Sequence, residues 1–306
     1  MKRRDVLLAT GTAALAGATA GCSGILDDDE EERQAYEEAV ETLVANHEHL
    51  EELAEDDDDR DESDIDELRG RLADAEESLE EAADADLDEE RAAAEDVVEF
   101  QELLVDSHEL GLEVERAVDD AEAVFETDQF DEAATEYDAA GELLEDAREL
   151  FDDLEEAHGD LETEVLEERE LAYDDELGEY AGADSVDELE VFEEFIDAMV
   201  EMSRGFEALL VGLQDIESDR WEVAERELRT ALNHFETAEA TLSAIRDDDD
   251  LPGDVRPDVI ELVSVVGDMA DGTALTVEAA VAGQRGDYSD ADALLAEAGS
   301  IFEGTA

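Results

Sequence analysis

The sequence predicts an all-α fold in which antiparallel helical hairpins form an elongated bundle or a solenoid. Three observations support this class. Ala, Leu, Glu and Asp dominate the chain, and only two prolines occur, Pro252 and Pro257. Apolar residues recur every three or four positions, as on one face of a helix. No segment shows the period-two alternation that a half-buried strand requires.

The first 21 residues have the features of an export signal and are excluded from the fold. Arg3 and Arg4 precede an apolar run from Val6 to Ala20, and Cys22, the only cysteine, follows. About 15 apolar residues are too few to span a bilayer but suffice for a signal peptide. The segment resembles a twin-arginine (Tat) signal that ends in a lipobox. This resemblance implies that a translocase recognises Arg3 and Arg4 and that Cys22 becomes the lipidated N-terminus.

Two residues depart from that pattern. Thr19 stands where a lipobox usually has Leu, and Lys2 replaces the usual Ser or Thr before the arginine pair. The alternative is a plain secretory peptide cleaved nearby, which would leave Cys22 as a free thiol. A lone cysteine cannot form an internal disulfide. Two acyl chains on Cys22 would hold the protein durably at a membrane, whereas one chain would hold it only marginally.

Breaks in the helical pattern define the remaining elements. Aspartates fill positions 56–59 and 247–250, and a glycine-containing joint runs from Gly178 to Asp184. We expect helices over roughly 30–55, 64–84, 88–127, 130–158, 160–174, 186–217, 219–246 and 257–303, the last broken near Gly286. The expected organisation is a signal (1–21), a short linker (22–29), an acidic helical region (30–180) and a helical hairpin region (185–306).

Three helices begin with an aromatic residue and share one apolar pattern. Small or apolar residues follow each aromatic at offsets of three, seven, ten and fourteen, which places them in one stripe along a helix. The series are Phe130, Ala133, Tyr137, Ala140, Leu144; Trp221, Ala224, Leu228, Ala231, Phe235; and Tyr288, Ala291, Leu295, Ala298, Phe302. We interpret Phe130, Trp221 and Tyr288 as packing anchors at the turns of hairpins.

The stretch from Gly286 to Ala291, Gly-Asp-Tyr-Ser-Asp-Ala, resembles the start of the second helix of a tetratricopeptide repeat (TPR). The likeness covers about 100 residues of the chain and implies a TPR-like solenoid. The anchors are not spaced by the usual repeat of about 34 residues, so a regular tandem array is not expected. Ordinary antiparallel helix pairs are the alternative, and both interpretations predict α-hairpins.

The charge composition is extreme. Asp and Glu number 100 against 18 Lys and Arg, for a net charge of -82. Such repulsion normally favours disorder, yet 43% of the residues are hydrophobic and regularly spaced. The composition resembles that of haloarchaeal proteins, whose carboxylates are screened at molar salt. Nucleic acid is excluded as a partner because it is also strongly negative.

Two short histidine motifs are weak candidates for metal ligands. His49 and Glu52 form a His-x-x-Glu pair that resembles the motif of imelysin-like, iron-associated lipoproteins. Glu155 and His158 form a Glu-x-x-His pair, as in di-iron helical bundles. With about a third of the residues acidic, such pairs arise by chance. We therefore expect no metal and no other cofactor.

The functional prediction is a protein-interaction scaffold on the extracytoplasmic face of the membrane, held by a lipid anchor and binding an unknown protein partner at the cell surface. No nucleophile elbow, phosphate-binding loop or zinc cluster occurs in the sequence, so an enzyme is not expected. The alternative is a metal- or iron-handling helical bundle of the imelysin-like kind.

Overall fold

The computed structural model describes residues 28–55, 62–82, 87–161, 183–248, 251 and 255–305. Within these ranges the chain forms eight α-helices and no strand, which confirms the predicted all-α class. The helices are α1 (Asp28–Glu55), α2 (Glu62–Glu81), α3 (Asp88–Phe125), α4 (Phe130–Asp160), α7 (Ala183–Glu217), α8 (Trp221–Asp247), α9 (Arg256–Arg285) and α10 (Tyr288–Thr305).

Most predicted boundaries lie within three residues of the observed ones. The expected break near Gly286 separates α9 from α10. The helix expected over 160–174 falls almost wholly outside the described residues, as do the signal, nearly all of the linker and most of the joint from Gly178 to Asp184.

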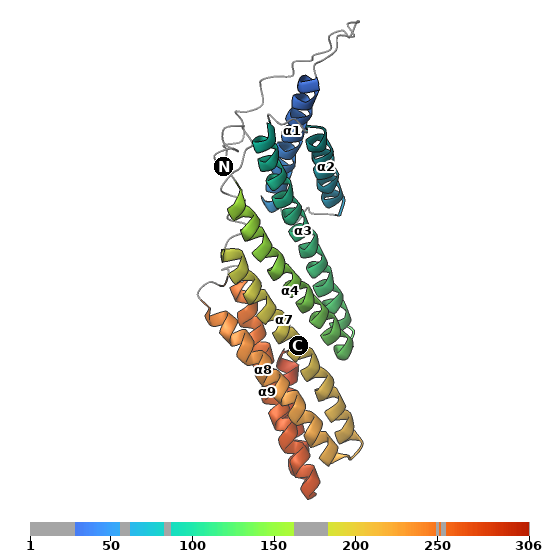
Figure 1. Cartoon of the computed structure of the whole chain (residues 1–306). Helices are drawn as coiled ribbons and strands as arrows, with labels where there is room; N and C mark the ends of the chain where they lie inside the picture. Colours follow the sequence, from blue (N-terminus) through green and yellow to red (C-terminus); the bar gives the residue numbers. More distant parts are fainter. Residues whose placement is uncertain are drawn as a thin grey trace, which may run out of the picture.

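The helices stack side by side into an elongated body (Figure 1). Helices α1, α2 and α3 pack together at one end, and the order then runs α3–α4, α4–α7, α7–α8, α8–α9 and α9–α10. Each described helix therefore packs chiefly against its neighbours in sequence, as in a solenoid. None of them has an apolar stretch long enough to cross a bilayer.

Among the described residues, three turns that join antiparallel helices are built alike. Asp128, Asp219 and Gly286 adopt the left-handed conformation, with φ of 61°, 58° and 82°. In each turn the next residue donates its amide to a carbonyl five residues earlier, which is the Schellman closure of a helix. These bonds are Gln129 N to Val124 O (3.4 Å), Arg220 N to Asp215 O (2.8 Å) and Asp287 N to Ala282 O (3.0 Å). The next helix then begins at the aromatic residue in all three cases.

Within the two C-terminal hairpins, glycines of the first helix receive large side chains of the second. A Cβ atom at Gly205 would lie 2.8 Å from the ring of Phe235, and one at Gly272 would lie 2.4 Å from the ring of Phe302. Both glycines precede the turn aromatic by 16 residues, and both phenylalanines follow it by 14. In α3, Val114 holds the glycine position, opposite the smaller Leu144 of the same register in α4. In these hairpins, the residue 16 positions before the turn aromatic therefore lies opposite the residue 14 positions after it, and a smaller residue on one helix is matched by a larger one on the other.

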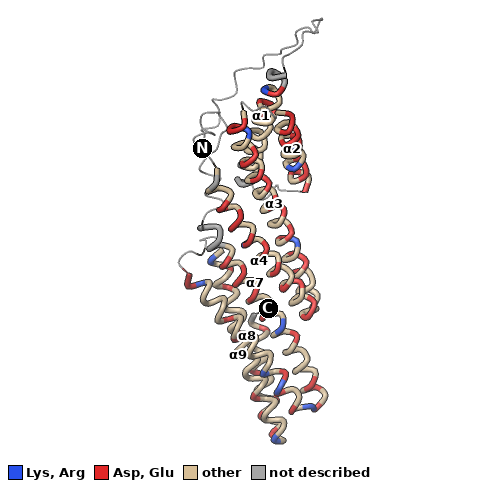
Figure 2. Tube along the Cα trace, in the orientation of Figure 1, with Lys and Arg blue, Asp and Glu red and all other residues tan. Residues whose placement is uncertain are grey.

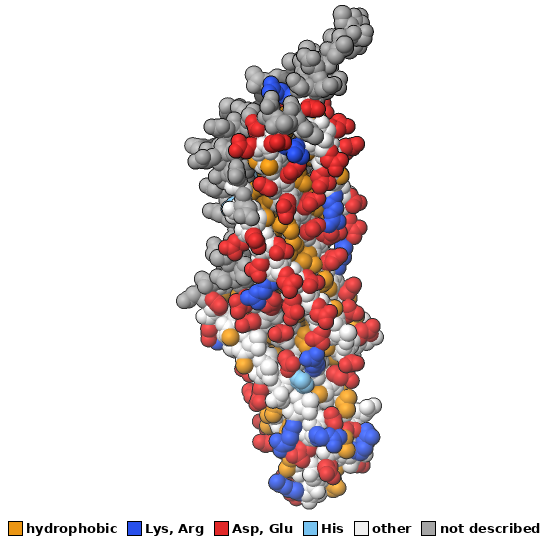
Figure 3. Space-filling model, in the orientation of Figure 1, with side chains coloured by type: hydrophobic (Ala, Val, Ile, Leu, Met, Phe, Trp, Pro, Cys, Tyr) orange, Lys and Arg blue, Asp and Glu red, His pale blue; other side chains and the backbone are white. Residues whose placement is uncertain are grey.

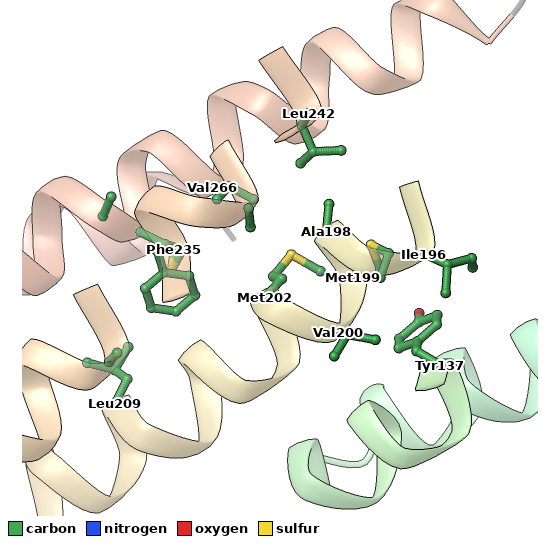
Figure 4. Close-up of a cluster of buried hydrophobic side chains, with 14 of the residues drawn as sticks. Tyr137, Ile196, Ala198, Met199, Val200, Met202, Leu209, Phe235, Leu242 and Val266 are labelled. Carbon is green, nitrogen blue, oxygen red and sulfur yellow. The ribbon is translucent and has the colours of Figure 1, made fainter. Parts of the chain in front are cut away.

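Buried side chains form two clusters along the body. One joins α1, α2, the first half of α3 and the end of α4. The other joins the second half of α3 to α4, α7, α8 and α9. Figure 4 shows the centre of the second cluster, where Ile196 and Val200 of α7 face Tyr137 of α4, while Met202 and Leu209 lie toward Phe235 of α8. The boundary between the clusters therefore falls within α3 and α4.

Asp and Glu residues recur along the described helices (Figure 2). Arginines are sparse, and several of them lie near the turns at one end of the body. On the face shown in Figure 3, apolar side chains interrupt the acidic cover over the middle of the molecule.

Candidate functional site

The predicted signal and anchor residues, Arg3, Arg4 and Cys22, lie outside the residues that the structure describes. Their roles in export and lipidation remain predictions from sequence.

His49 of α1 faces α2. Its Nδ1 lies 3.2 Å from Nη1 of Arg71, and its Nε2 lies 3.9 Å from a carboxylate oxygen of Asp64. The side chain of Glu52 lies outside the described part of α1. A guanidinium in contact with the imidazole opposes the approach of a cation, so this histidine is better explained as a link between two helices.

Glu155 and His158 have different surroundings although they are three residues apart. Glu155 is exposed, whereas His158 is half-buried and its ring lies 5.8 Å from that of Phe100, centre to centre. Among the described residues, no group of three or more His, Cys, Asp and Glu side chains converges on a position that could hold a metal ion.

The three predicted anchors differ in their surroundings. Phe130 is buried and stacks on Phe206 of α7, with ring centres 5.0 Å apart. Trp221 lies directly against the backbone of α9, because a Cβ atom at Gly283 would be 2.3 Å from its ring. Tyr288 is 58% exposed, and its ring lies 6.1 Å from that of Trp221.

An apolar hollow of about 390 Å³ lies between α3, α4 and the start of α7. It is open to solvent on one side, and we call it the α3–α4–α7 groove. Its lining residues are Ser107, His108, Gly111, Val114, Glu115, Val118 and Asp119 of α3; Leu144, Ala147 and Phe151 of α4; and Leu189 and Phe192 of α7. Pockets of this size and apolar character commonly hold small ligands or inserted side chains.

Aromatic residues shape one wall of the groove. Phe192 is 38% exposed and is one of several large apolar residues that reach the surface. It stacks in parallel on Phe195, with ring centres 6.3 Å apart. Gly111 leaves open space on the opposite wall, because a Cβ atom there would meet nothing within 4 Å. The groove therefore has room for an apolar side chain from outside the molecule.

Polar groups of the groove lie at its floor and rim. His108 is 5% exposed and lies among apolar neighbours. Glu115 and Asp119 are exposed on the α3 side. Beside the groove, Arg148 of α4 pairs with Glu190 and Glu193 of α7, at 3.7 and 3.3 Å, and so ties α7 to α4.

The sequence reasoning missed this groove. A signal was present in α3, where Ser107, Gly111, Val114 and Val118 follow helical spacing and keep one face small or apolar. The aromatic wall on α7 could not be placed from sequence, because it depends on how α7 packs on α4.

A polar cluster bridges α4, α7 and α8 on the surface. Glu201 accepts a hydrogen bond from His234 at 2.7 Å, and Arg204 pairs with Asp138 at 2.6 Å. Burial and the neighbouring carboxylates of Asp138 and Glu201 raise the pKa of Asp197. The cluster therefore links the α3–α4 hairpin to the α7–α8 hairpin.

Another hollow, of about 470 Å³, is lined by polar residues of α8 alone, so it is a shallow surface depression.

Comparisons with protein-family models, with curated proteins and with solved structures found no match for this chain.

Proposed function

We propose that this chain is an extracytoplasmic, lipid-anchored scaffold that binds a protein partner through its helical hairpins in high salt. One observation carries the proposal: the α3–α4–α7 groove is an apolar hollow open to solvent, with Phe192 exposed in its wall, on a protein whose composition is strongly acidic. Exposed apolar surface of this kind marks interaction sites in soluble domains.

The form of the groove suits an amphipathic segment of a partner. Helices from two hairpins supply its walls, which is the geometry of helix-in-groove recognition. Phe192 and Phe151 provide aromatic surface, and aromatic residues are frequent at the energetic centre of protein interfaces.

High salt favours this mode of binding. At about 1 M salt the Debye length is about 3 Å, so the carboxylates at the rim of the groove repel an acidic partner only at very short range. Contact between apolar surfaces does not depend on charge. The anchor rests on sequence alone: acylation of Cys22 would place the described helices near the membrane, since the predicted linker is short.

The metal-handling alternative has less support. Arg71 lies against His49, and Glu155 and His158 differ in exposure. Elemental analysis of the protein purified from membranes tests this alternative directly, because a stoichiometric transition metal would favour it.

The test of the scaffold proposal uses a variant that fills the groove. Gly111→Phe adds a ring at a position where an added Cβ atom meets no neighbour within 4 Å. Gly70→Phe is the matched control, since Gly70 is exposed on α2, also has open space around it and does not line the groove. Tagged full-length chains are expressed in the native host, purified from membranes in multimolar KCl and compared by quantitative mass spectrometry.

We expect a stoichiometric partner with the wild-type chain and with Gly70→Phe, and at least a tenfold loss with Gly111→Phe, as for removal of a good hot spot. Equal recovery with both variants would show that the groove is not the binding site. The mass of the N-terminal peptide from the same samples tests the anchor, because an unmodified Cys22 would contradict it.

A further inference from the structure

Four side chains form a continuous polar network across α4, α7 and α8. Nη2 of Arg204 in α7 donates to Oδ2 of Asp138 in α4 at 2.6 Å, and Nη1 of Arg204 lies 3.6 Å from Oε1 of Glu201. The other carboxylate oxygen of Glu201 lies 2.7 Å from Nδ1 of His234 in α8. These four side chains, which we call the α4–α7–α8 network, join the α3–α4 hairpin to the α7–α8 hairpin.

Only one type of side chain in this network ordinarily changes its charge near neutral pH. Arginine stays positive in proteins. Carboxylic acids ordinarily lose their proton below about pH 5, and histidine ordinarily changes its charge between about pH 5 and pH 8. The charge of the α4–α7–α8 network therefore depends on His234 in this range.

The carboxylates around the network outnumber its cations while His234 is neutral. Burial is the main cause that raises the pKa of Asp197, which lies one turn before Glu201 in α7. Charged neighbours also act on this pKa: Asp138, Glu201 and Glu145 raise it, and Arg204 lowers it. A proton on His234 adds a second cation beside these carboxylates.

The other carboxylates of α8 near His234 are engaged or lie on other faces of the helix. Glu227, two turns earlier on the same face, bonds to a guanidinium of α8 at 3.0 Å. Glu225 and Glu239 face α9, where they lie against Gln284 and Gly267. Glu236 is two residues from His234 and so projects in a different direction. Among the described residues, Glu201 is thus the carboxylate in contact with His234.

Partial burial keeps the central contact effective in high salt. The side chains of His234 and Glu201 are 23% and 25% exposed, whereas Arg226 of a typical surface pair is 69% exposed. Salt screens exposed pairs strongly and partly buried pairs much less. A change in the charge of His234 therefore alters the contact between α7 and α8 even in multimolar KCl.

We propose that the α4–α7–α8 network is a pH-sensitive switch, in which a proton on His234 creates an ion pair with Glu201 and holds the two hairpins together more tightly. Between about pH 5.5 and pH 7.5 the proton is lost, and Glu201 then accepts only a neutral hydrogen bond. The stabilisation is present at the lower pH and lost as the pH rises, which is the sign for a cation favoured in the folded state. None of the four residues lines the α3–α4–α7 groove, so the inference does not depend on the function proposed above.

Hydrogen exchange of the full chain in multimolar KCl tests the switch. The rates of the α7 amides 196–204 are measured at about pH 5.5 and pH 7.5 and divided by the intrinsic rates of unstructured peptides at the same pH. We expect protection about fivefold higher at the lower pH, because a hydrogen bond between charged partners is roughly twice as strong as a neutral one. Protection that is equal at the two pH values, or lower at the acidic one, would overturn the proposal.

Three variants show which groups carry the response. His234→Gln keeps an N–H donor for Glu201 but cannot gain a charge, and Glu201→Gln removes the carboxylate, so both should lose the response. His49→Gln is the matched control, because His49 is 18% exposed and links α1 to α2 instead. It should respond as the wild type does. A response that persists in His234→Gln and Glu201→Gln, or that disappears in His49→Gln, would contradict the assignment.

Asp197→Asn separates the histidine from its acidic neighbour. This variant should raise the protection at the higher pH, because a repelled carboxylate is removed, and it should keep a pH response, because His234 still titrates. If the response disappears in Asp197→Asn, the switch belongs to that carboxyl group and the assignment to His234 is wrong.

Discussion

Two polar residues, Asn46 and Gln101, are buried between α1 and α3, and few hydrogen bonds hold their side chains. Asn46 of α1 and Gln101 of α3 are almost fully buried, at 0% and 2% exposure. Nδ2 of Asn46 donates to Oε1 of Gln101 at 3.1 Å, and Nε2 of Gln101 donates to the carbonyl of Leu43 at 3.1 Å. Among the described residues, Oδ1 of Asn46 has no hydrogen-bond partner. A buried pair of this kind is costly to break and inexpensive to replace as a whole.

The first prediction follows from that asymmetry. Gln101→Met should lower the free energy of unfolding by about 1–3 kcal/mol, because the Asn46 amide is left buried without an acceptor. The double variant with Asn46→Leu should recover most of the loss, since both polar groups are then absent. Denaturant unfolding in multimolar KCl measures both values. Asn46→Leu alone is measured as well. If the double variant loses as much free energy of unfolding as the two single variants lose in sum, the two side chains are not energetically coupled.

Contacts between whole helices depend on glycines in the first helix of a hairpin. At Gly212 of α7, a Cβ atom would lie 2.6 Å from Cγ of Leu228 and 3.3 Å from its backbone nitrogen. The close approach of α7 and α8 is therefore possible only without a side chain at this position. Ala121 and Ala279, both fully buried, hold the same place nine residues before the aromatic in the other two hairpins.

The second prediction compares two glycine substitutions that should change the stability of the protein in opposite directions. Gly212→Ala should destabilise the protein by about 1–3 kcal/mol, as overpacking does in close-packed cores. Gly70→Ala should stabilise it by roughly 0.5–1 kcal/mol, because Gly70 is exposed inside α2 and alanine is the better helix former. Thermal unfolding followed by circular dichroism distinguishes them. A neutral Gly212→Ala would mean that α7 and α8 can separate at little cost.

At the scale of the whole molecule, the acidic surface sets the conditions under which the fold is stable. The net charge is -82, and every described helix contains Asp or Glu residues (Figure 2). At about 0.1 M salt the Debye length is about 10 Å, so carboxylates on neighbouring helices repel one another. At about 1 M it is about 3 Å, and this repulsion is largely removed.

The third prediction is a rise in melting temperature with KCl concentration. Between about 0.1 M and about 2 M KCl, we expect an increase of at least 10 °C, because several kcal/mol of repulsion are screened. Sucrose at equal osmolality is the control, since it favours the compact state without screening charge. An equal rise in sucrose and in KCl would contradict the electrostatic explanation.

The sequence by itself determined the helical elements, because helix formation depends on local spacing and composition. The aromatic residues at 130, 221 and 288 mark the helix starts correctly, since the residues just before them form the left-handed turns. The predicted all-α class and the antiparallel hairpins follow from the same local patterns. The weak histidine motifs also came from local spacing, and spacing alone could not show that Arg71 lies against His49.

Only the tertiary structure decided which helix covers which face. The α3–α4–α7 groove exists because the aromatic residues of α7 lie beside a small-residue face of α3, about 80 residues away in sequence. Tyr288 of α10 is 58% exposed, whereas Trp221, which begins α8 with the same sequence pattern, packs against Gly283 of α9. Apolar periodicity shows that a face can be buried, but the partner that buries it depends on packing between distant segments.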